Sequence, residues 1–131
     1  MTDEDFRTAF EAGTLDPAVF DHRAHLRMGW IYVTAHPLGE AITRFSHALR
    51  HFTQVVGAEA KYHETITVFF LLLIGEKQAH GQFTAFDEFL EANPDLTATE
   101  PSVLSVYYRG ETLASEHARR HYVLPDQLTA A

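Results

Sequence analysis

Three histidines in two short runs are the residues whose types and spacing are best suited to chemistry. His22 and His25 lie in the run F-D-H-R-A-H-L, and His63 precedes Glu64 in the run K-Y-H-E-T-I-T. Neutral imidazole is the commonest metal ligand in proteins. Three imidazoles with one open position suit Zn²⁺, Ni²⁺ or Fe²⁺, whereas two histidines with a carboxylate suit a non-haem iron centre. The pattern predicts a divalent metal site held by His22, His25 and His63.

Glu64 is the candidate catalytic residue of such a site. A carboxylate beside a ligating histidine can be a further ligand, orient the histidine or act as a general base. A glutamate in the first turn of a helix is also favoured by the helix dipole, which requires no catalytic role. The run H-E-T-I-T departs from the zinc-protease motif H-E-x-x-H because position 67 is threonine, so a zinc-protease assignment is unsupported.

The same histidines admit two other interpretations, namely a buried hydrogen-bonded network and independent surface positions. Gly29 shares a predicted helix face with His22 and His25. Because glycine weakens a helix, its presence indicates either close packing by another helix or space for an ion or ligand. His47 and His51 fall on the polar face of their predicted helix and are expected at the surface.

Three residues are candidates for substrate binding: Tyr62, Trp30 and Arg119. Tyr62 directly precedes His63, and both aromatic side chains combine an apolar ring with a polar group. Arg119 offers a guanidinium that binds carboxylate or phosphate in a bidentate manner. The alternatives are core or rim positions for the aromatic residues and a structural salt bridge for the arginine.

Helices have to position these groups, and the residues that begin and end helices predict where those helices lie. Caps, prolines and glycines divide the sequence into helices over 2–12, 21–35, 37–56, 62–80 and 84–92, followed by one or two short helices within 99–124. The continuous apolar run over 68–74 places the helix 62–80 at the centre. We therefore expect an all-α protein, a single compact bundle of four to six helices forming one domain over 1–131.

Composition narrows the classes of function. The chain has 131 residues, no cysteine and a formal net charge of −8. The absence of cysteine excludes thiolate metal sites and cysteine nucleophiles. The negative charge argues against nucleic acid and anionic membrane surfaces as partners. The acidic start lacks the features of a signal peptide, and no apolar run is long enough to span a membrane, so a cytoplasmic protein is expected.

The two histidine runs also carry a resemblance. F-x-H-x-x-H-L followed by a tryptophan, together with K-Y-H-E-T-I-T, resembles an uncharacterised family of small bacterial all-helical proteins. The late stretch 104–126 is similar as well, so the resemblance covers roughly residues 20–126. It implies an all-helical fold and marks His22, His25, His63 and Glu64 as the motif positions. It implies no activity.

Two hypotheses of function follow. The first is a metal-dependent enzyme acting on a small molecule, in which the ion activates water or polarises a substrate oxygen. Hydrolysis, isomerisation and oxygen chemistry all stay open. The second is a non-catalytic module that binds a ligand or a protein partner and contains a buried histidine network. A homo-oligomer, or an accessory subunit with an exposed apolar patch, is a further possibility.

Overall fold

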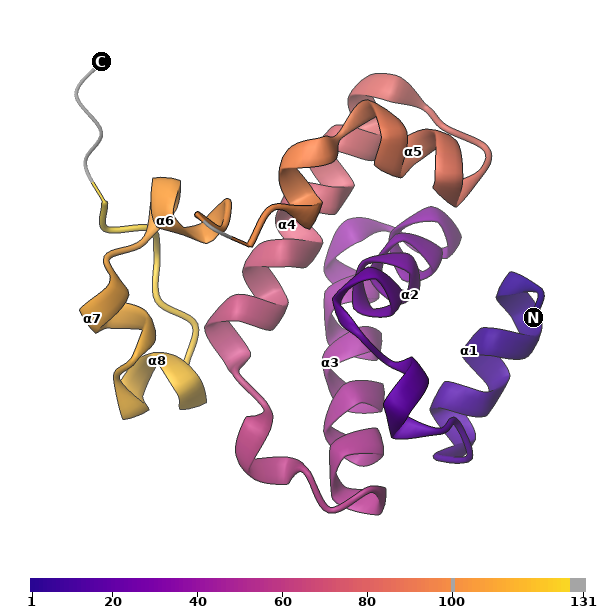
Figure 1. Cartoon of the computed structure of the whole chain (residues 1–131), viewed down its shortest axis with the longest axis horizontal. Coiled ribbons are helices and arrows are strands. Elements are labelled where there is room, and N and C mark those ends of the chain that lie inside the picture. The colour runs from indigo at the N-terminus through magenta and orange to yellow at the C-terminus, as the bar shows by residue number, and fades with distance from the viewer. Residues whose placement is uncertain (100, 128–131) are drawn as a thin grey trace.

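In the computed structural model, which describes residues 1–99 and 101–127, the chain is all-helical (Figure 1). Within that part there are eight α-helices: α1 (Asp3–Ala12), α2 (His22–Ala35), α3 (Leu38–Val55), α4 (Glu64–Gly81), α5 (Phe86–Ala92), α6 (Leu104–Tyr107), α7 (Gly110–Leu113) and α8 (Glu116–Arg120). Three short 3-10 turns connect them: η1 (Pro17–Val19), η2 (Glu59–Lys61) and η3 (Pro94–Thr97).

The expected starts and ends of the long helices follow from their capping residues. Asp21 begins α2 because its Oδ1 accepts the backbone N–H of Ala24 at 2.9 Å. Gly13 ends α1 in the left-handed region, with φ of 75°. The helix expected over 84–92 begins two residues later, since α5 starts at Phe86 and its N-cap, Ala85, makes no side-chain capping bond.

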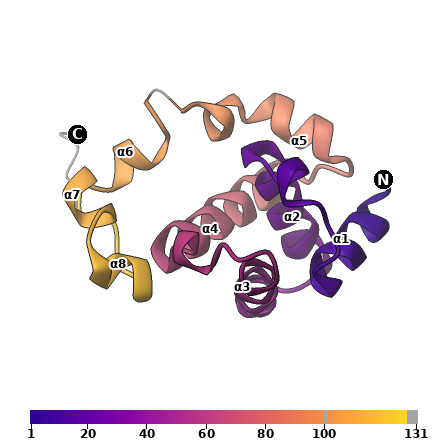
Figure 2. The ribbon, with the colours of Figure 1, turned by 60° about the horizontal axis from the view of Figure 1, so that its bottom comes forward.

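The core lies where α1, α2, α3 and α4 pack together. α4 contacts α2, α3 and α8, and α1 covers the other side of α2 and α3 (Figure 1, Figure 2). An aromatic cluster fills the space between α1, α2 and α3 and consists of Phe10, Phe20, Tyr32, Phe45 and Phe52. The apolar run in α4 supplies further buried residues, including Phe69, Leu71 and Ile74.

The C-terminal segment is divided more finely than the sequence indicates. We expected one or two short helices within 99–124, whereas the structure has α6, α7 and α8 there. Ser115 causes one of these divisions, because its Oγ accepts the N–H of Ala118 and begins α8. The bundle of four to six helices is therefore not confirmed in its count, although the all-α class is. Figure 2 shows α7 and α8 on the far side of α4 from α1.

Within residues 1–99 and 101–127, no helix is both long enough and apolar enough to cross a membrane.

Candidate functional site: two adjoining cavities beside His25

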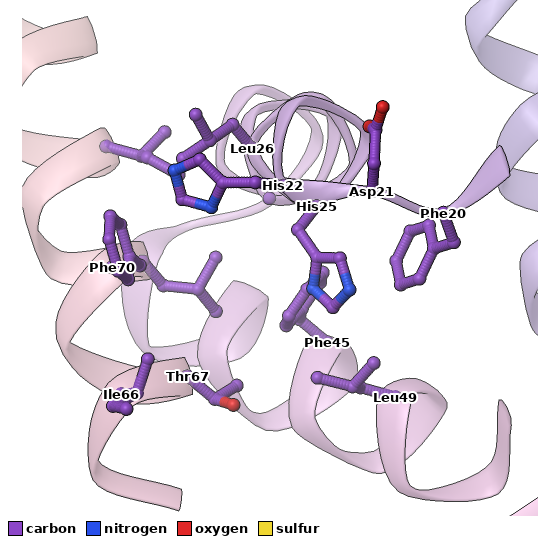
Figure 3. Close-up of a pocket in the computed structure, with 13 residues that line it drawn as sticks. Phe20, Asp21, His22, His25, Leu26, Phe45, Leu49, Ile66, Thr67 and Phe70 are labelled. Carbon is purple, nitrogen blue, oxygen red and sulfur yellow. The ribbon is translucent and has the colours of Figure 1, made fainter. Parts of the chain in front are cut away.

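A cavity of about 280 Å³ lies between α2, α3 and α4, and we call it cavity A (Figure 3). Its walls are largely apolar and include Phe45, Leu49, Ile66, Phe70, Leu71 and Ile74. Four polar side chains also reach it: Asp21, His22, His25 and Thr67. A mostly apolar hollow with a few polar groups has the usual make-up of a small-molecule site.

A second cavity of about 320 Å³, cavity B, adjoins the first. Five residues line both: Phe20, His25, Leu49, Ile66 and Thr67. Cavity B extends toward η2 and the start of α4, where Lys61, Tyr62 and His63 contribute to its wall. His25 and Thr67 therefore supply the polar groups at the junction of the two cavities.

His25 projects from the first turn of α2 into this junction (Figure 3). Its ring stacks on Phe20, with the centroids 3.9 Å apart. The His25 side chain is nevertheless exposed, because solvent reaches the ring through both cavities. Desolvation, followed by repulsion from His22, lowers the pKa of His25 from 6.5 to about 4. The imidazole is therefore neutral at pH 7 and offers one hydrogen-bond donor and one acceptor.

His22 is engaged with a distant backbone group. Its Nε2 lies 2.8 Å from the carbonyl oxygen of Leu96 in η3. Because a carbonyl only accepts, Nε2 carries the proton and donates. The ring also meets Phe70 edge-on, at 5.7 Å between centroids. His22 therefore joins the start of α2 to η3, while its side chain forms part of the wall of cavity A.

His63 uses both of its ring nitrogens within the protein. Nε2 donates to the carbonyl oxygen of Leu113 at 2.8 Å. Nδ1 accepts the backbone N–H of Ile66 at 3.2 Å, so the imidazole is the N-cap of α4. A metal ion could bind this ring only by replacing one of these hydrogen bonds.

The predicted metal site gains no support from this arrangement. Across residues 1–99 and 101–127, no group of three or more histidine, aspartate or glutamate side chains is placed to hold an ion. His22 and His25 reach cavity A, but His63 faces cavity B and is held by Leu113 and Ile66. Both His22 and His63 are hydrogen-bonded to backbone carbonyls, but His22 is exposed and His63 half-buried, so a buried histidine network and the ligand set His22–His25–His63 both stay predictions.

Glu64 belongs to a different network. Its Oε1 accepts hydrogen bonds from the hydroxyl of Tyr62 at 2.5 Å and from Arg50 at 3.2 Å. The Arg50 guanidinium also lies over the Tyr62 ring, 5.0 Å from its centroid. Burial and the hydrogen bond to Glu64 raise the pKa of Tyr62 to about 12. Glu64 lines neither cavity A nor cavity B, and its carboxylate holds Tyr62 and Arg50 in place.

The structure brings two of the three candidate substrate-binding residues together, because Tyr62 and Arg119 both line a separate hollow of about 230 Å³. Tyr62 lines cavity B. Trp30 is buried in the core, where its indole N–H donates to Oε1 of Gln78 at 2.8 Å. Arg119 pairs with Glu116 on the surface of α8. Neither Trp30 nor Arg119 lines cavity A or cavity B, and the salt-bridge alternative fits Arg119.

Gly29 marks close packing between α2 and α4. A Cβ built on Gly29 would lie 3.0 Å from the terminal carbons of Leu71 and Ile74, which is tighter than ordinary van der Waals contact. Of the two alternatives that the sequence left open at Gly29, close packing by another helix therefore fits better than space for an ion or ligand. Gly29 also forms part of the wall of cavity A. His47 and His51 are exposed on α3, as the helix face predicts.

Two threonines of this region, Thr65 and Thr67, were not among the functional residues that the sequence analysis predicted. Thr65 is fully buried, and its hydroxyl lies 2.6 Å from the carbonyl oxygen of Ala118 and 2.7 Å from that of His121. It also accepts the N–H of Val123 at 3.1 Å. Thr67 lines both cavities. The one available signal was the pair of threonines inside an otherwise apolar helix start.

Comparison of the whole chain with protein-family models, with curated proteins and with solved structures found no match.

Proposed function

We propose that this chain is a binding protein for a small, largely apolar molecule that occupies cavity A. The observation that carries the proposal is the placement of His25. Its neutral ring projects into the junction of two apolar-walled cavities, and no hydrogen bond joins it to any residue among 1–99 and 101–127. A neutral imidazole in such a place binds a hydroxyl or amide of a ligand as donor or acceptor.

The other polar groups of cavity A have partners of their own. Asp21 accepts the N–H of Ala24, and His22 donates to Leu96. Thr67, like His25, has no hydrogen bond to its side chain among the described residues. In Figure 3 its oxygen points from α4 toward the side of the cavity formed by Leu49. The ligand chemistry that fits is therefore an apolar body carrying one hydrogen-bonding group within reach of His25 and Thr67.

Calorimetric titration with 2-naphthol, compared with naphthalene, tests this proposal. We expect saturable binding of 2-naphthol, and about 2- to 10-fold weaker binding after His25→Leu, which keeps the apolar volume and removes the ring nitrogens. Naphthalene should bind both proteins alike. His47→Leu, a change at an exposed histidine of α3, is the matched control. Absence of saturable binding, or equal 2-naphthol affinity after His25→Leu, would overturn the proposal.

The metal-dependent interpretation predicts a separate result. The metal content of the untagged protein would be stoichiometric and would fall in both His22→Ala and His63→Ala while surviving His47→Ala. We expect no such pattern, because both ring nitrogens of His63 are already bonded within the protein. Stoichiometric metal lost in both variants would replace the binding proposal with the enzyme hypothesis.

A further inference from the structure

The two cavities differ in the charge of their walls. The residues lining cavity A include one formally charged side chain, Asp21, whose carboxylate caps α2. Among the described residues that line cavity B, Lys61 is the one with a full formal charge, and no carboxylate is present. This is unusual in a chain with a net charge of −8, in which acidic residues outnumber basic ones by 18 to 10.

Lys61 also lacks an acidic partner within the part of the chain that the structure describes, since none of the ion pairs found there involves it. The other lysine, Lys77, pairs with Asp95 at 3.2 Å. The ammonium group of Lys61 therefore differs from that of Lys77 in having no carboxylate within 4.0 Å among residues 1–99 and 101–127.

The remaining polar groups of cavity B are occupied. Thr53 donates to the carbonyl oxygen of Arg50 at 2.8 Å, and Tyr62 donates to Glu64. His63 uses both ring nitrogens, as described above. The polar groups left for a ligand are thus Lys61 at one end and His25 with Thr67 at the junction.

We infer that the ligand of cavity A is an amphiphile whose apolar body lies in cavity A and whose singly charged anionic head pairs with Lys61 in cavity B. This inference rests on the proposed function and adds the charge and the shape of the ligand. The body passes between His25 and Thr67, the two polar side chains that line both cavities. A linear carboxylate of medium chain length has this distribution of apolar surface and charge.

The head group is held at a place where solvent still reaches. Lys61 is exposed, so its attraction for a carboxylate is that of a surface ion pair and weakens with added salt. The apolar body supplies most of the affinity by leaving water. Charge therefore selects the anionic amphiphile over a neutral one of equal length, with a modest preference.

Titration of the full chain with octanoate and with 1-octanol separates these contributions. We expect octanoate to bind more tightly than 1-octanol at low salt. Lys61→Met should weaken octanoate binding about 2- to 5-fold and leave 1-octanol binding unchanged. Lys77→Met, which removes the lysine paired with Asp95, should change neither affinity. Raising the salt concentration should reduce octanoate affinity in the parent protein and have a smaller effect in Lys61→Met.

The outcomes distinguish this inference from the proposed function. If 1-octanol binds and octanoate affinity is the same in the parent protein and in Lys61→Met, the pairing of an anionic head group with Lys61 is overturned. The proposed apolar binding site in cavity A is then kept. If neither compound binds, the inference and the proposed function both fail. If octanoate loses affinity equally in Lys61→Met and Lys77→Met, the effect is one of overall charge, and the assignment to Lys61 is overturned.

Discussion

The imidazole of His63 donates to the carbonyl oxygen of Leu113 at 2.8 Å and so joins the start of α4 to the end of α7. His22 makes the equivalent contact to Leu96, which joins the start of α2 to η3. In both cases a histidine at a helix start satisfies a backbone carbonyl of a short, distant helical segment. The two histidine motifs therefore attach the starts of α2 and α4 to later segments of the chain, and His25 is the motif histidine whose ring has no hydrogen bond among the described residues.

The first prediction concerns the attachment made by His63. His63→Ala removes the cap of α4 and leaves the Leu113 carbonyl without its donor, so the free energy of unfolding should fall by about 1–3 kcal/mol. Urea unfolding followed by circular dichroism measures this change. His47→Ala, at an exposed position, should stay within about 0.5 kcal/mol of the parent. Equal losses in the two variants would contradict the role of His63.

The second prediction concerns Thr65, which holds the segment around α8. Thr65→Val keeps the volume but removes the hydroxyl that contacts Ala118, His121 and Val123. Each buried group left unsatisfied costs about 1–3 kcal/mol, unless the segment moves to let water in. We expect local opening, seen as faster hydrogen exchange at the amide of Val123 with smaller changes in α2 and α3.

Thr43→Val is the matched control for this experiment, because Thr43 is exposed and its hydroxyl bonds only to the carbonyl of Gly39 one turn earlier. It should leave exchange at Val123 unchanged. Unaltered protection of Val123 in Thr65→Val would show that other contacts hold this segment to α4.

The four long helices, α1 to α4, were predictable from the sequence because the residues that begin and end them act locally. Asp21 and Gly13 act on backbone groups within a few residues, so their effect is readable from neighbouring letters. The partner of His63 was not predictable, because it is a main-chain carbonyl 50 residues away and any residue carries such a group. For the same reason the histidine spacing resembled a ligand set while two of its members had backbone partners.

Gly29 shows a second limit of the sequence. The position of Gly29 predicted that a ligand or another helix lies close to α2, but a glycine is expected in both cases. Only the structure identifies Leu71 and Ile74 as the neighbours. Lys61 is a similar case, since its proposed pairing with an anionic head group depends on the absence of carboxylates among the described residues that line cavity B.

The third prediction follows from this packing. Gly29→Ala gains about 0.5–1 kcal/mol from better helix propensity, and it loses part of this gain through the tight contacts with Leu71 and Ile74. Both neighbours line cavity A and have space to shift, so thermal unfolding should show a stability within about 1 kcal/mol of the parent. Gly29→Val adds more volume at the same place and should destabilise by about 1–3 kcal/mol. A stabilised Gly29→Val would contradict close packing.

The fourth prediction is a pH dependence that originates from His25. Its pKa is 6.5 in the unfolded chain and about 4 in the folded protein. Desolvation lowers this pKa most and repulsion by His22 lowers it further, while attraction by Asp21 raises it by a smaller amount. Between these two pH values the unfolded chain binds more protons than the folded protein. The contribution of His25 to the free energy of unfolding is therefore fully present above about pH 6.5 and is lost as the pH falls toward 4. Urea unfolding at several pH values should show a smaller slope across this window in His25→Leu than in the parent, whereas His47→Leu should keep the parent slope. An NMR titration that places the midpoint of the His25 ring at or above 6.5 would contradict a desolvated imidazole at the junction of the two cavities.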